Sequence, residues 1–218
     1  MGGRRYYVTF TDDHSHYSSL TMLRMKDKTL EAYKAYAMWM YTQHSMQIKR
    51  LWLDHGGEYT GNEFTKFLME QGMEHRLTMH DTPQHNGVAE SLNWCIMEHI
   101  CACLIQSGLL KSLWAEAMNF IIWVKNCTTT KVLGDITPHE KLTGRKPNLA
   151  GVPEWGQRVW VHCRDGSKLE AHAWPACWVR FDAGSMHAHC IYWPSICGIT
   201  ASAKRNSSYS TYSILFLT

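Results

Sequence analysis

Two carboxylates stand where catalysis could use them: Asp54 at the end of a predicted strand and Glu90 at the start of a predicted helix. Carboxylate oxygens are hard ligands that suit Mg²⁺, so such a pair could bind a divalent metal. Each residue also has a plainer interpretation as a solvated charge, and Glu90 could complement the positive end of its helix. Because Asp and Glu together number 19, spacing alone is weak evidence, and the surrounding residues must decide.

A second set of possible ligands is Cys95, His99 and Cys103, which repeat every four residues along one stripe of a predicted helix. A structural zinc site normally uses four ligands, whereas small sulfur-containing residues are readily buried. We therefore interpret the stripe as part of the hydrophobic core. The eight cysteines include no C-x-x-C pair, which favours free thiols in a reducing compartment.

Length and composition are those of a folded protein. The chain has 218 residues, of which 45% are hydrophobic and 19% charged, and this mixture excludes a disordered chain. The net charge of +3 permits a polyanionic partner without demanding one. The longest apolar run, at 120–124, is far too short to cross a bilayer, and no signal peptide is evident. We therefore expect a soluble protein.

The elements that position Asp54 and Glu90 follow from hydrophobic periodicity. The chain before Asp54 predicts a β-hairpin, a helix and a strand; the chain between the two carboxylates predicts a short helix, a strand and a loop. Glu90 then falls in the first turn of a long helix that ends at Gly108. The expected bounds are strands at 5–11, 18–25 and 48–53, helices at 29–44 and 62–72, a strand to 79, a loop at 81–87, and helices at 88–108, 113–125 and 138–142.

Beyond Gly156 the chain changes character. Short β-like stretches at 158–162, 177–181 and 190–193 are separated by Gly, Pro, Ser and Asp. This order predicts a mixed α/β domain over residues 1–147, a small β-rich region over 148–200 and an unassigned tail over 201–218.

The residues around the two carboxylates resemble the signature blocks of copia-type retrotransposon integrases. The first block reads LDHGGEY at 53–59, and the second reads TPQHNGVAE at 82–90. Further matches follow in order, so the resemblance extends from residue 2 to about 193 and is highly specific. These matches are GG at 2–3, YYVTF at 6–10, DD at 12–13, WAEA at 114–117, Asn126, TPHE at 137–140, GRKP at 144–147 and RVWVH at 158–162.

This resemblance implies an α/β fold, a ribonuclease H-like integrase core that lacks its first strand and is followed by a small β-rich C-terminal region. In the family, two Asp and one Glu hold two Mg²⁺ (or Mn²⁺) ions for 3′-end processing and strand transfer of element DNA. The resemblance thus implies catalytic and metal-ligand roles for Asp54 and Glu90, and nucleic-acid contacts for Gln84, Asn86 and Asn93. It also implies element-end and target DNA as partners, a possible homo-oligomer, no membrane partner and a nuclear location.

The family's first catalytic Asp lies on the strand before the one that begins at Arg5, so we expect it upstream of Met1. Asp12 and Asp13 belong to the turn after the second strand in the resemblance, where Asp residues ordinarily make local hydrogen bonds. The absent strand is central to the family's sheet, and its neighbours would lack backbone partners. We therefore expect no strand transfer from this chain alone.

Basic residues that reach DNA phosphates usually follow the family's Glu, roughly as E-R-x-N-R, whereas this chain reads ESLNW at 90–94. Phosphate contacts at both positions are therefore expected to be weakened. At five other positions the family tends to have Arg, whereas this chain has His, Trp or Cys. The codons of these three residues are each one transition from CpG-containing Arg codons, which indicates mutational erosion. The alternative is that surface arginines vary freely. The five positions are His16, His172, Trp174, Cys177 and Cys190.

Three functional hypotheses follow. A polynucleotidyl transferase fragment would act only if the missing strand came from another chain or a longer gene product. A non-catalytic transposon remnant would act at most as a weak nucleic-acid-binding or protein-interaction module. A ribonuclease H-type nuclease shares the fold but is disfavoured by the signature blocks. Whether the chain is an enzyme is thus left open by its sequence.

Overall fold

The computed structural model describes residues 3–53, 62–77, 83–163, 172–182, 185–204 and 212–216. The chain divides into two compact units, each of which we describe by itself. The core unit comprises residues 2–97 and 122–147, and the β-rich unit comprises residues 98–121 and 148–218. Residues 98–121 are thus grouped with the β-rich unit, while the predicted boundaries at 147 and 200 stay a prediction.

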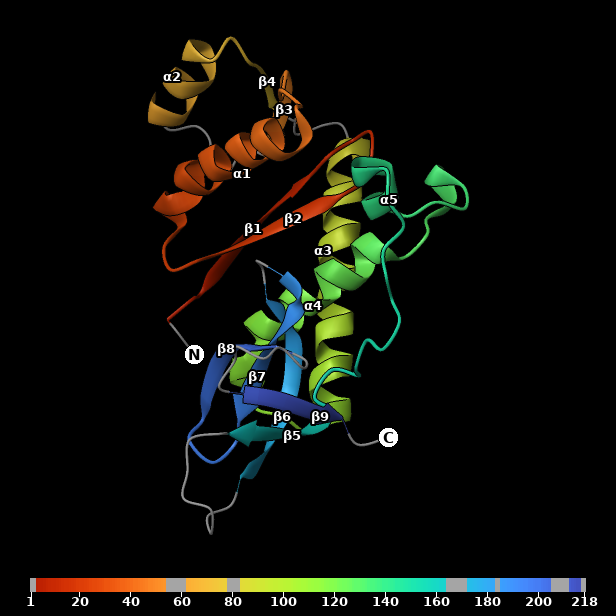
Figure 1. The fold of residues 1–218 in the computed structure, drawn as a ribbon. Coiled ribbons are helices and arrows are strands. Elements are labelled where there is room, and N and C mark those ends of the chain that lie inside the picture. Colours follow the sequence, from red (N-terminus) through yellow and green to blue (C-terminus); the bar gives the residue numbers. More distant parts are fainter. Residues whose placement is uncertain are drawn as a thin grey trace. The chain divides into compact units, whose positions relative to one another are not determined.

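The core unit begins with a β-hairpin and a helix, as the sequence predicts (Figure 1). Its first elements are β1 (Tyr6–Thr11), β2 (Ser18–Leu23), α1 (Thr29–His44), β3 (Arg50–Leu53), α2 (Asn62–Glu70) and β4 (Glu74–Leu77). Strands β1 and β2 pair antiparallel, with Tyr6 opposite Leu23. Strands β3 and β4 pair in parallel, which requires a crossover connection, and α2 lies in that connection.

A cluster of aromatic side chains joins the hairpin to α1 and α2. Phe10 of β1 stacks on Tyr36 of α1 with ring centroids 4.9 Å apart, and Tyr33 lies 5.6 Å from the ring of Phe64. Burial raises the pKa of Tyr33 to about 12. Aromatic pairs in such geometries contribute roughly 0.5–1.5 kcal/mol beyond their buried area. The same core contains Leu53, so it also anchors the strand that precedes the first candidate carboxylate.

The hairpin and the parallel pair form two separate two-stranded sheets in the described part of the chain. Among those residues, β1 pairs only with β2, and β3 pairs only with β4. Both pairs nevertheless enter one hydrophobic core, through Val8 and Phe10 of β1 and Leu53 of β3. In the described residues, the two pairs are thus joined by side-chain packing and not by a shared ladder of backbone hydrogen bonds.

Helix α3 (Pro83–Ser107) begins earlier than the sequence predicts. The predicted loop at 81–87 is wrong from residue 83 onward, because Pro83 suits the first position of a helix: it has no N–H to leave unpaired, and its φ is already helical. The helix ends before Gly108, which has a left-handed φ of 65° and terminates it as predicted. Glu90 therefore lies beyond the first turn of α3.

Helices α4 (Trp114–Cys127) and α5 (Pro138–Thr143) confirm two further predicted helices. Local sequence explains α5. The hydroxyl of Thr137 accepts a hydrogen bond from the N–H of Glu140 at 3.1 Å, Pro138 follows the cap, and Gly144 ends the helix in a left-handed conformation. Of the helices that the structure describes, none has the length and apolar character needed to span a bilayer.

Within its described residues, the β-rich unit contains five antiparallel strands. They are β5 (Arg158–Cys163), β6 (Ala173–Asp182), β7 (Ser185–Trp193), β8 (Gly198–Lys204) and β9 (Tyr212–Phe216). Their order in the sheet is β8-β7-β6-β5-β9. Strand β9 lies in the tail that the sequence leaves unassigned, because its pairing with β5, with Phe216 opposite Val159, is not visible in local sequence. Trp178 is fully buried in this unit, and its indole N–H donates to Nδ1 of His189 at 2.9 Å.

Gly156 lets the chain ahead of β5 approach the end of α3 within the β-rich unit. Its φ is +82°, and a Cβ placed on it would lie 2.5 Å from the Cβ of Ser107. Its N–H also donates to the carbonyl of Trp178 at 2.9 Å, so this segment cannot move away freely. We expect Gly156→Ala to lower the free energy of unfolding by about 2–3 kcal/mol, through left-handed backbone strain and overpacking.

Urea denaturation of the full chain measures this loss. Gly144→Ala is the matched control, because Gly144 has a φ of +71° with nothing within 4 Å of a built Cβ. The control should lose only the backbone part, about 1 kcal/mol. Equal losses at the two positions would contradict the close approach at Gly156.

Candidate active site

Glu90 projects from α3 with its side chain exposed. The first turn of α3 contains no acidic residue, so Glu90 does not serve to complement the helix N-terminus. A carboxylate on a regular helix has a defined direction, and solvent exposure leaves it accessible to a hydrated cation. Its donor chemistry, with that of Asp54, fits Mg²⁺ or Mn²⁺.

The other predicted site residues are described in part. Asp54 lies outside the described residues; in the sequence it follows Leu53, the buried last residue of β3. Gln84 and Asn86 belong to α3 by their backbone, and their side chains are outside the description. Asn93 is half-buried, and its amide oxygen is buried with no hydrogen-bond partner among the described residues. A buried acceptor without a partner lowers the stability of the fold by roughly 1–3 kcal/mol. Asn93 therefore has an acceptor that could take a hydrogen bond, three residues after Glu90.

The stripe of Cys95, His99 and Cys103 is not a core stripe. Cys95 and His99 are exposed, and Cys103 is half-buried. The interpretation from the sequence is wrong because, among the described side chains of α3, the buried ones are Ile96 and Ile100, which lie about 100° further around the helix. Within the described residues, no group of three or more His, Cys, Asp or Glu side chains could hold a metal ion.

Asp12 and Asp13 lie in the turn between β1 and β2. One carboxylate oxygen of Asp12 accepts the N–H of Ser15 at 2.8 Å and the hydroxyl of Ser15 at 2.6 Å. His16 completes the turn with a left-handed φ of 56°. The local hydrogen-bonding role predicted for a turn Asp is thus confirmed for Asp12.

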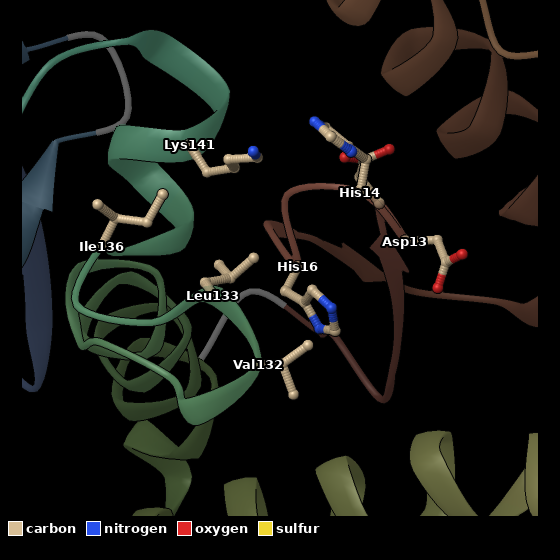
Figure 2. A pocket seen from close by; sticks show the side chains of 8 residues that line it. Asp13, His14, His16, Val132, Leu133, Ile136 and Lys141 are labelled. Atoms are coloured by element: carbon tan, nitrogen blue, oxygen red, sulfur yellow. The ribbon is translucent and has the colours of Figure 1, made fainter.

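An open hollow of about 630 Å³ lies between this turn and the segment that leads into α5, within the core unit. Figure 2 shows the side chain of Lys141 directed toward His14, while His16 lies above Val132. The lining combines the two turn aspartates, one lysine, two histidines and an apolar wall. These charges are mixed in sign and favour neither an anion nor a cation, so we assign the hollow no ligand.

Lys125 and Asn126 of α4 anchor the hairpin, a role that periodicity did not reveal. The amide oxygen of Asn126 accepts the N–H of Ser18 at 2.9 Å, and its amide nitrogen donates to the carbonyl of Ser18 at 2.8 Å. Lys125 donates to the carbonyl of His16 at 2.7 Å and to the hydroxyl of Ser18. Burial lowers the pKa of Lys125 to about 8. The only sequence signal was the match of Asn126 to the family.

Replacing Lys125 by Met should change how stability depends on pH. The pKa of Lys125 is about 8 in the folded protein and 10.5 as the ordinary value. Between pH 8 and pH 10.5, Lys125 is protonated in the unfolded chain but largely deprotonated in the folded one. The unfolded chain therefore binds more protons, and the free energy of unfolding rises with pH. Below pH 8 the folded protein carries the full cost of a buried ammonium. From pH 7.5 to 9.5 the unmodified chain should gain about 1 kcal/mol relative to Lys125→Met, allowing for partial exposure.

Urea denaturation at the two pH values measures this difference, and comparison with the variant removes the titration of tyrosines and cysteines elsewhere. Lys34→Met, which changes an exposed lysine of α1, is the control and should show no such slope. A parallel pH dependence for the unmodified chain and Lys125→Met would refute the buried ammonium.

No family model matches the chain. Over 183 residues the chain is 31% identical to the retrovirus-related Pol polyprotein from transposon TNT 1-94 of Nicotiana tabacum. The aligned region covers 83% of this chain and 14% of that protein. Over 195 residues it is 26% identical to the Gag-Pol polyprotein of transposon Ty1-LR3 of Saccharomyces cerevisiae. That aligned region covers 88% of this chain and 11% of the relative. The chain thus spans between 11% and 14% of the length of these relatives.

Among solved structures, the chain is similar to a chain of the simian T-cell lymphotropic virus intasome in complex with the PP2A regulatory subunit B56 gamma. The TM-score is 0.51 at 15% sequence identity, and the similarity covers 95% of this chain and 71% of that chain. At this identity the likeness concerns the fold alone.

Proposed function

We propose a function from one premise: the chain belongs to the retrovirus-related Pol polyproteins of copia-type transposons. Its fold is the ribonuclease H-like α/β fold of integrase catalytic cores, which confirms the fold class predicted from the sequence. The proposed function is that of a retrotransposon integrase core, DNA integration by metal-dependent polynucleotidyl transfer. The observation that carries it is the 31% identity over 83% of the chain.

Asp54 and Glu90 are the proposed metal ligands and catalytic residues. These carboxylates would hold Mg²⁺ or Mn²⁺, and the bound metal would supply activation of the attacking oxygen and stabilisation of the leaving oxygen. Helix α3 supports this role by presenting the Glu90 carboxylate on a regular, exposed element. Burial of Leu53 supports it by anchoring the strand that precedes Asp54. A third carboxylate, expected on a strand ahead of β1, would complete the ligand set, so we propose that this chain is inactive by itself.

The partners proposed for the longer protein are element-end and target DNA, with a homo-oligomer in the nucleus. Gln84, Asn86 and Asn93 are the proposed DNA contacts near Glu90. The amide oxygen of Asn93, which has no partner among the described residues, supports a contact there, because it can accept from an amino group on a base edge while the amide nitrogen donates to a phosphate or base acceptor. These proposals rest on the resemblance to integrases.

A second candidate function is that of a non-catalytic transposon remnant, at most a weak nucleic-acid-binding or protein-interaction module. One feature of α3 favours it. Ser91 and Trp94 occupy the positions where the family has basic residues; both are exposed, and Trp94 is 71% exposed. The surface that follows Glu90 therefore presents a hydroxyl and an indole where arginines would attract phosphates.

A gel-shift assay with element-end duplex DNA at 50 and 200 mM salt separates a DNA-binding role from that of a protein-interaction remnant. Binding through even two phosphate contacts should weaken about tenfold between these concentrations. Trp94→Arg should strengthen binding at low salt and steepen the salt dependence, whereas Trp94→Gln, which removes the ring without adding charge, should do neither. Absence of a shift at both concentrations, for the chain and for Trp94→Arg, would favour the protein-interaction remnant.

A further inference from the structure

The β3–β4 pair of the core unit has one apolar and one polar face. On β3, Leu51 and Leu53 pack into the core while the residues between and before them are exposed, as in a half-buried strand. The exposed side chains of the pair are mainly aromatic and charged rather than small and polar. This face, which we call the Trp52 platform, consists of Arg50, Trp52, Glu74 and Arg76.

Glu74 holds the two arginines of the platform in place. The parallel register puts Arg50 opposite Glu74, and Nε of Arg50 and Nε of Arg76 each donate to one carboxylate oxygen of Glu74 at 2.8 Å. Hydrogen bonds from Arg50 and then Arg76 lower the pKa of Glu74, so it stays a carboxylate. Two guanidinium charges therefore face one carboxylate, and each guanidinium has five N–H donors. The platform is net positive.

Arg76 also positions the indole of Trp52. The two residues are opposite each other in the register, and the guanidinium carbon lies 5.5 Å from the ring centroid, within the range of a cation–π interaction. Even with this contact the Trp52 side chain remains 45% exposed. An exposed indole held in one orientation beside cations is the arrangement on which single-stranded nucleic acids stack their bases.

We propose that the Trp52 platform binds an unpaired nucleobase at the end of the DNA substrate, an inference that rests on the proposed function. Trp52 stacks on the base, and Arg50 and Arg76 contact the adjoining phosphates. A base inside a duplex keeps both faces stacked on its neighbours and offers none to an exposed ring, whereas an unpaired base does. The position supports a DNA end, because Trp52 stands two residues before Asp54 on the strand that leads to it.

Charge and shape favour nucleic acid over a protein partner at this face. Both arginine side chains are about half exposed, at 52% for Arg50 and 48% for Arg76. Their positive charges can therefore contact the phosphates of a nucleic acid. Every base has a π-face, so the platform should tolerate many sequences. Leu51 and Leu53 supply the contact of β3 with the hydrophobic core.

Fluorescence anisotropy with labelled oligonucleotides tests the platform on the full chain. The probes are a single-stranded oligothymidine and a blunt duplex, and the variants are Trp52→Ala, Trp52→Phe and Arg76→Gln. Trp52→Ala should weaken single-strand binding about tenfold, as the loss of one base–aromatic stack does, and should change blunt-duplex binding less than twofold. Trp52→Phe should keep most of the affinity, and Arg76→Gln should weaken binding and flatten its salt dependence.

Trp174→Ala is the matched control, because Trp174 is 53% exposed in the β-rich unit; it should leave both probes unchanged. Circular dichroism and a urea midpoint establish that each variant folds. Unchanged single-strand binding by Trp52→Ala, or an equal loss of affinity for both probes, overturns the proposal that the Trp52 platform binds an unpaired base. In either case, duplex binding that weakens with salt still supports the proposed function. A chain that binds neither probe at low salt overturns both.

Discussion

Addition of one upstream β-strand that carries an aspartate should give the chain Mg²⁺-dependent strand-transfer activity, whereas residues 1–218 alone should give no product. The two-stranded sheets explain why. In the described part of the chain, β1 and β3 each pair with one strand only, although Phe10 and Leu53 place both in one core. A strand that pairs with these edges would satisfy their backbone groups and bring a third carboxylate to Asp54 and Glu90.

The measurement is the conversion of labelled element-end oligonucleotides into products joined to a target plasmid. In the extended protein, Asp54→Asn and Glu90→Gln should each lower the rate roughly 100-fold or more, because loss of a metal ligand removes several kcal/mol of transition-state stabilisation. Asp13→Asn, which makes the same chemical change in the β1–β2 turn, should retain activity. Strand transfer by residues 1–218 alone, abolished by Asp54→Asn, would show that no further strand is needed.

Glu116→Ala should destabilise the β-rich unit by about 2–4 kcal/mol. Glu116 of α4 accepts a hydrogen bond from Nε of Arg180 of β6, and the side chains are only 11% and 21% exposed. Burial acts to lower the pKa of Arg180, and the hydrogen bond and charge of Glu116 raise it above its ordinary value. Removing the carboxylate leaves a guanidinium with little access to water, a change that costs roughly 3–5 kcal/mol for fully buried pairs.

A double-mutant series of urea midpoints separates this effect from simple loss of packing. Glu116→Leu combined with Arg180→Leu should be more stable than Glu116→Ala, because it leaves no unpaired charge. The exposed pair of Lys28 and Glu31 is the control, and Glu31→Ala should cost less than about 1 kcal/mol. If the double variant loses as much stability as Glu116→Leu and Arg180→Leu lose separately when their losses are added, the two side chains are not coupled as we infer.

Local elements were largely predictable from the sequence because their determinants lie within a few residues of one another. The periodicity of α1, the Thr137 cap of α5 and the left-handed Gly108 each act through neighbouring backbone. One local signal is ambiguous. The turn chemistry around Pro83 predicts a loop, but proline is equally suited to begin a helix, and Pro83 begins α3.

The exposure of particular side chains was less predictable. The spacing of Cys95, His99 and Cys103 indicates a common helix face, but it does not say whether that face meets the core or solvent. In the structure the burial of Ile96 and Ile100 decides the matter. A helix with apolar residues on several faces leaves this choice to the elements that pack against it.

The sequence by itself determined the family, through signature blocks around Asp54 and Glu90, and with it the chemistry proposed for the longer protein. Only the tertiary structure decided which distant groups meet: Arg180 with Glu116, 64 residues away, and Asn126 with Ser18, 108 residues away. It also decided that the hairpin and the parallel pair are separate sheets and that Trp52 stands exposed beside Arg76. The physical reason is that hydrogen bonds, ion pairs and burial between remote segments depend on packing, which periodicity along one segment does not encode.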